Sequence, residues 1–99
     1  MRQSWIEQIR EAVRQARYDM TAHATQEMAE DGLDIVDVEQ AILTGFVKRI
    51  ERQDPRGKKF VIVGTATDGT TPVGVVGRFS LENWFLIITV YKTGADSVN

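Results

Sequence analysis

Apolar residues in the first half of the chain recur at the spacing of one helix face, and this pattern predicts three helices. Their expected ranges are residues 4–17, 22–31 and 34–45. The third range opens on Asp34 with Asp37 three residues later, which approximates a capping box. We expect the apolar stripes to form the core, with the following side chains buried: Trp5, Ile9, Val13, Met28, Val38 and Ile42.

From Phe46 onward the period changes to the alternation of strands, and we expect four of them: Phe46–Arg52, Lys59–Ala66, Pro72–Phe79 and Trp84–Lys92. Residues 18–21 are expected to form a short extended link or a strand. Helices followed by a run of strands predict an α+β fold. Residues 1–99 therefore read as one domain, with the N-terminal helices packed on one face of a four-stranded, mainly antiparallel sheet.

Composition narrows the class of protein. The chain has no cysteine, which excludes disulfides and thiol catalysis, and its single histidine with scattered carboxylates offers no convergent metal site. We therefore expect no metal and no cofactor. No stretch approaches the roughly 18 apolar residues of a membrane span, and the N-terminus lacks the apolar block of a signal peptide. A cytoplasmic location without a membrane partner is expected.

The net charge of −2 argues against a general nucleic-acid binder, but the charges are unevenly distributed. Residues 18–47 hold seven acidic residues and no lysine or arginine, whereas residues 48–59 hold six basic residues and two acidic ones. One interpretation is a positive surface that attracts RNA. The other is a solvated strand edge that lysine and arginine protect against pairing. The RNA-binding candidates on this segment are Lys48, Arg49, Arg52, Lys58 and Lys59.

His23 is the first candidate for chemistry, because it is the only histidine and follows a predicted helix cap. Thr21 has the residue type that accepts a hydrogen bond from the first helical turn. A histidine held there can act as an acid, a base or a hydrogen-bonding switch. The alternative is that His23 packs, or bonds to the backbone, at this junction.

Arg78 and Tyr91 are candidates because of where strand alternation places them. Arg78 stands among apolar strand residues, where a charge needs water or a partner. It could hold a phosphate with two parallel hydrogen bonds, or form a salt bridge to Glu82. On the last strand, Trp84, Leu86, Ile88 and Val90 form the better core face. Tyr91 is therefore expected on the open side, to contact a base or a phosphate or simply to lie half-buried.

Several motifs in order along the chain resemble the domain of unknown function 4258 family (DUF4258), over roughly residues 17–92. They are Thr21-x-His23-Ala24-x-x-x-Met28, Asp31-Gly32-Leu33-Asp34, Asp54-Pro55-Arg56-Gly57, Phe60-Val61-Ile62-Val63-Gly64 and Ile87-Ile88-Thr89-Val90-Tyr91. The resemblance implies a RelE/ParE-like fold and membership of a type II toxin–antitoxin pair, with an antitoxin protein as partner.

In RelE-like toxins the open face of the sheet takes RNA, and that analogy joins His23, Arg78 and Tyr91 into one catalytic site. It implies a metal-independent endoribonuclease, with His23 and Tyr91 as acid or base and Arg78 with Lys58 as the phosphate clamp. The chain departs from the family in one respect. Where many relatives have arginines, it has Glu27, Ala29 and Asp31. A catalytically inactive relative, or a non-enzymatic protein-interaction module, is therefore the alternative.

Overall fold

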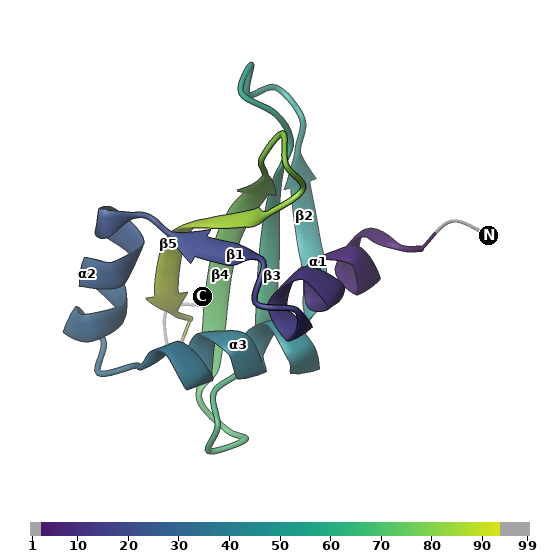
Figure 1. Ribbon diagram of the computed structural model, residues 1–99. Coiled ribbons are helices and arrows are strands. Elements are labelled where there is room, and N and C mark those ends of the chain that lie inside the picture. Colours follow the sequence, from purple (N-terminus) through teal and green to yellow (C-terminus); the bar gives the residue numbers. More distant parts are fainter. Residues whose placement is uncertain (1–2, 94–99) are drawn as a thin grey trace.

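The computed structural model describes residues 3–93, which form three helices and five strands (Figure 1). Their bounds are α1 Trp5–Arg14, β1 Tyr18–Met20, α2 Ala22–Glu30, α3 Ile35–Thr44, β2 Phe46–Glu51, β3 Lys59–Thr65, β4 Pro72–Phe79 and β5 Phe85–Lys92. The three predicted helices and four predicted strands are confirmed, with ends that differ by up to three residues. Asp34 and Asp37 form the expected capping box, and Thr21 caps α2 through a 3.1 Å hydrogen bond from the Ala24 amide.

The sheet has five strands in the order β1-β5-β4-β3-β2, so the prediction of a four-stranded sheet is one strand short. Strands β2 to β5 pair antiparallel, as expected, whereas β1 pairs parallel with β5 and makes the sheet mixed. In this pairing Tyr18 lies opposite Phe85 and Met20 opposite Ile87. The extended segment at residues 18–21 was expected as a link or a strand, but its place in the sheet was not, because its partner lies more than sixty residues along the chain.

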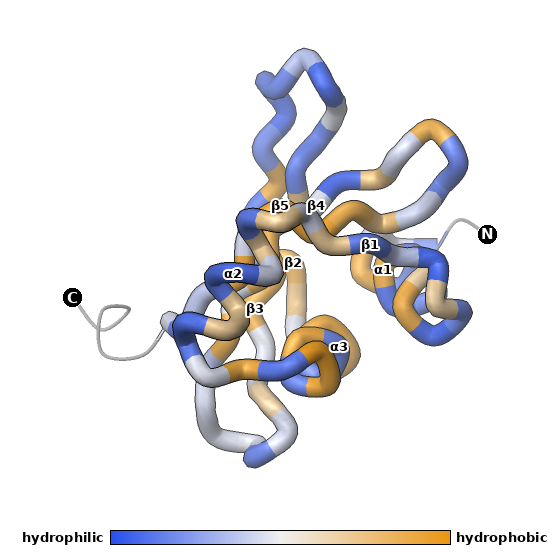
Figure 2. The backbone as a smooth tube through the Cα atoms, turned by 60° about the vertical axis from the view of Figure 1, so that its left-hand side comes forward, coloured by the Kyte–Doolittle hydropathy of each residue, from blue (hydrophilic) through white to orange (hydrophobic). Residues whose placement is uncertain are grey.

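Helices α1 and α3 cover one face of the sheet, and the core lies between the two layers (Figure 1). Figure 2 shows the apolar residues gathered in α1, α3 and the strands, while α2 is largely polar. Of the six side chains expected to be buried, Ile9, Val13, Val38 and Ile42 are buried, and Met28 is half-buried against the core. Trp5 is 37% exposed, because it lies at the first turn of α1, at the margin of the core.

Helix α2 lies along the free edge of β5, beyond the end of the short strand β1. Ala24 turns into the core, and two acidic side chains reach the strand. The Glu27 carboxylate accepts a 3.1 Å hydrogen bond from the Val90 amide, and the Asp31 carboxylate accepts one of 3.1 Å from the Lys92 amide. These carboxylates replace the neighbouring strand that the edge lacks.

A β-bulge in β5 overturns the predicted core face of this strand. Val76 of β4 pairs with Thr89, but the next residue of β4 pairs with Ile87, which leaves Ile88 as an extra residue. The extra residue reverses the alternation. Phe85 and Ile87 therefore point into the core before the bulge and Val90 after it. Of the four residues expected inside, only Val90 is buried, whereas Trp84, Leu86 and Ile88 are partly exposed.

The edge contacts make a prediction about stability. Glu27→Ala should lower the free energy of unfolding by about 1–3 kcal/mol, because it leaves the Val90 amide without a partner. Glu30→Ala is the matched control. Glu30 lies on the same helix, and among the described residues its side chain bonds only to that of Gln26, so we expect a change within about 0.5 kcal/mol. Urea unfolding and hydrogen exchange of the Val90 amide measure both effects. Equal losses in the two variants would contradict the edge role.

Candidate nucleic-acid interface

The sheet face turned away from α1 and α3, here called the outer face, has none of the described helices packed on it (Figure 1). Strand register places side chains on it in rows across the strands. One row runs through Arg49, Val61, Val76 and Thr89, and the next through Phe46, Val63, Gly74 and Tyr91. The outer face is thus a mainly apolar surface that carries isolated basic and aromatic groups.

Tyr91 lies on the outer face, as strand alternation predicted, with its ring against the backbone of Gly74. A Cβ atom at Gly74 would lie only 2.2 Å from the Tyr91 ring. The missing side chain therefore makes the space that the ring occupies. This contact fixes the ring in one place on the sheet.

Arg78 lies on the same face, opposite Leu86, and is half-buried. It forms no ion pair within residues 3–93, so the alternative interpretation, a salt bridge to Glu82, is not realised there. Four residues separate Arg78 from Gly74 along β4, or roughly 13 Å at about 3.3 Å per residue. A single phosphodiester that touches both Arg78 and Tyr91 would have to lie between them.

His23 projects from the first turn of α2, and its side chain is 67% exposed. Its Nε2 atom lies 3.2 Å from Oε2 of Glu27. The other carboxylate oxygen of Glu27 accepts the hydrogen bond from the Val90 amide, next to Tyr91. His23 is thus neither packed in the core nor bonded to the backbone. One carboxylate links it to the strand that carries Tyr91.

Two of the five basic candidates of residues 48–59 are paired with acidic side chains. Arg49 and Lys59 are engaged by Glu51, and Lys59 also by Asp54. Hydrogen bonds from Arg56 lower the pKa of Asp54 to about 2, and those from Arg49 lower the pKa of Glu51. Lys48 and Arg52 form no ion pair within the described residues, while the Lys58 ammonium lies 5.6 Å from the centre of the Trp5 ring.

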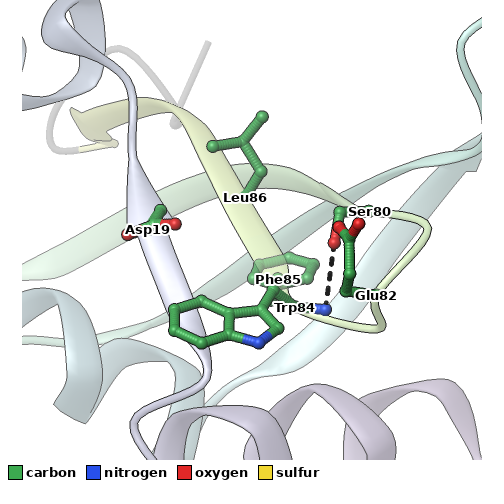
Figure 3. Close-up of a pocket in the computed structure, with 6 residues that line it drawn as sticks. All are labelled: Asp19, Ser80, Glu82, Trp84, Phe85 and Leu86. Carbon is green, nitrogen blue, oxygen red and sulfur yellow. Dashed lines mark hydrogen bonds between the residues drawn. The ribbon is translucent and has the colours of Figure 1, made fainter.

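A pocket of about 310 Å³ at the start of β5 was not predicted from the sequence (Figure 3). It lies where β1 joins β5, and its walls are Asp19, Ser80, Glu82, Trp84, Phe85 and Leu86. The alternation of the sequence assigned Trp84 and Leu86 to the core. The bulge that places them at the surface is visible only in the structure. Within residues 3–93, no three side chains of the metal-binding types come together.

These observations define a small α+β domain with one helical layer and an open sheet face. A family model described as Domain of unknown function (DUF4258) matches residues 20–92, and the chain belongs to this family. Neither a curated protein nor a solved structure matches the chain. No helix of the described part is long and apolar enough to cross a membrane.

The contact between Tyr91 and Gly74 can be tested by a double-mutant cycle. Gly74→Ala should cost about 1–3 kcal/mol in the wild-type protein, because the new methyl group displaces the ring. In a Tyr91→Ala background the same change should cost nothing, since the space is then free. Chemical unfolding of the four proteins gives the coupling energy. The same cost in both backgrounds would show that the ring lies elsewhere.

Proposed function

We propose that this domain is the RelE/ParE-like, toxin component of a type II toxin–antitoxin pair, and that its outer face binds RNA. The observation that carries the proposal is Arg78, a half-buried guanidinium on an open sheet face with no acidic partner in residues 3–93. A charge on an apolar surface is costly unless a counter-charge reaches it. A phosphate supplies that charge and accepts two parallel hydrogen bonds from a guanidinium.

Tyr91 supports RNA over other polyanions. Aromatic rings on a sheet surface stack on unpaired bases, at about 1–3 kcal/mol per base. The ring is held against Gly74, so it loses little freedom when a base stacks on it. The backbone positions of Arg78 and Tyr91 lie roughly 13 Å apart along the sheet. The Arg78 side chain and one phosphate group together span this distance, so a single phosphate can contact both the guanidinium and Tyr91.

Cleavage of the RNA would fall to His23 and Tyr91. Such cleavage needs one group to take the proton of the 2′-hydroxyl and another to protonate the leaving oxygen. The carboxylate of Glu27, 3.2 Å from His23 Nε2, can orient the imidazole and stabilise it when protonated. Arg78 would stabilise the charge that develops on the phosphate. Glu27 is therefore part of this proposed site, although its charge is unfavourable for RNA binding.

The rival function is a non-enzymatic protein-interaction module. Phe46 on the edge strand β2 is 61% exposed, and within residues 3–93 β2 pairs with β3 alone. Its other edge can accept a strand from a partner, which is a common mode of peptide recognition. A small helix-turn-helix or zinc-ribbon protein encoded beside this one would favour the toxin–antitoxin reading.

Salt titration of RNA binding tests the interface. A short fluorescent single-stranded RNA should bind with an affinity that falls with salt, at a slope of about −0.7 per neutralised phosphate. Arg78→Ala should weaken binding about tenfold and make the slope shallower by one contact. Arg14→Ala is the matched control, because Arg14 lies on α1 and pairs with Glu11. No binding at low salt, or equal losses in the two variants, would contradict the proposed interface.

Expression of the protein alone tests the toxic activity. We expect the wild-type protein to cause growth arrest and loss of RNA integrity. Arg78→Ala and His23→Ala should each lower the rate of RNA cleavage by about 10²-fold or more, and so restore growth. Arg78→Ala should have the larger effect, because stabilisation of transition-state charge is usually the larger contribution. Toxicity that survives Arg78→Ala would refute the site, and RNA binding without cleavage would identify an inactive relative.

A further inference from the structure

A second cleft lies on the helical side of the sheet, between the start of α1 and the β4–β5 turn. Its volume is about 320 Å³, and its walls are Trp5, Gln8, Lys58, Phe60, Phe79 and Asn83. Clefts of roughly 300–1,000 Å³ are the usual size of small-molecule sites. The proposed RNA surface lies on the opposite face, so this cleft is a separate feature.

The inner wall of the cleft is aromatic. The Trp5 ring lies 4.9 Å from the Phe60 ring and 6.4 Å from the Phe79 ring, measured between ring centres. Phe60 is buried and forms the floor, whereas Trp5 keeps 37% of its surface exposed. A planar apolar ligand would cover that exposed surface and gain the stacking geometry that aromatic rings prefer.

The polar groups of the cleft favour an anion with one charge. The Lys58 ammonium lies over the Trp5 ring, 5.6 Å from its centre, in a cation–π contact, and it forms no ion pair within residues 3–93. The amides of Gln8 and Asn83 are the remaining polar side chains, and none of the lining residues is acidic. A carboxylate would satisfy Lys58 directly, and the amides can donate to the same group.

We propose that this cleft binds an aromatic ring that bears a carboxylate, with the ring against Trp5 and the carboxylate on Lys58. Two sources can supply this chemistry: a free aromatic acid, or the C-terminal phenylalanine of a peptide. A nucleotide fits less well, because its phosphate carries about two charges and the cleft offers one ammonium group. The inference is independent of the proposed RNA function.

Tryptophan fluorescence provides the test, because the chain has two tryptophans and Trp84→Phe leaves Trp5 as the single reporter. Full-length Trp84→Phe protein is titrated with phenylacetate, with N-acetylphenylalanine, with its neutral amide and with phenethylamine. We expect saturable changes with the two carboxylates at millimolar concentrations or below. The neutral amide and the amine should bind at least about tenfold more weakly, since the charge pair is lost.

Two variants of the Trp84→Phe protein distinguish binding in the cleft from binding elsewhere on the surface. Lys58→Met should weaken phenylacetate binding about tenfold while leaving the thermal unfolding midpoint close to that of the parent. Lys48→Met removes an exposed lysine of β2 and should leave binding unchanged. If phenylacetate binds and N-acetylphenylalanine does not, the ligand is a free aromatic acid. If N-acetylphenylalanine binds more tightly, the ligand is the C-terminal phenylalanine of a peptide.

Three outcomes would overturn the inference: no saturable change with either carboxylate, equal binding of the acid and its amide, or tighter binding of uridine monophosphate than of phenylacetate. The last result would assign the cleft to RNA. If RNA binding to the outer face fails while phenylacetate binds, only the proposed function is contradicted.

Discussion

The backbone of α3 packs directly on the backbone of β3, and this contact seats the helical layer on the sheet. A Cβ atom at Gly64 would lie 2.0 Å from the carbonyl oxygen of Ala41, so only glycine allows this approach. The contact brings Val38 and Ile42 onto the sheet, where both are fully buried. Because α3 packs there with α1 beside it, the apolar residues of both helices cover the same face of the sheet. Among residues 3–93, the other face carries only strand side chains.

The edge of β5 shows how the chain uses its acidic helix. One carboxylate oxygen of Glu27 accepts a hydrogen bond from the Val90 amide of the strand, and the other contacts Nε2 of His23. The same residue thus stabilises the edge of the sheet and positions the histidine beside the strand that carries Tyr91. In the sequence, the acidic residues in and next to α2 stood out only because many relatives have arginines there. Their hydrogen bonds to β5 explain why a carboxylate, and not an arginine, suits this edge.

Local signals predicted much of this fold. The capping box at Asp34, the cap at Thr21 and the change of period at Phe46 each depend on neighbouring residues, and each is confirmed. The features that were missed depend on contacts between distant residues. They are the parallel pairing of β1, the bulge at Ile88 and the placement of α2 on the β5 edge. Because the bulge reverses the alternation, it also hid the pocket beside Trp84, whereas Tyr91, beyond the bulge, lies where the pattern put it.

The most direct test of the central claim is to map where RNA contacts the protein. In a titration of isotope-labelled protein with a short single-stranded RNA, NMR signals of Arg78, Val76, Thr89 and Tyr91 should shift together, along with the Arg78 side-chain NεH. Signals of the buried positions Ile9, Val38 and Ile42 should stay in place. Shifts confined to α1 and the exposed side of α3, or no shifts at low salt, would contradict the assignment of the open sheet face as the nucleic-acid interface.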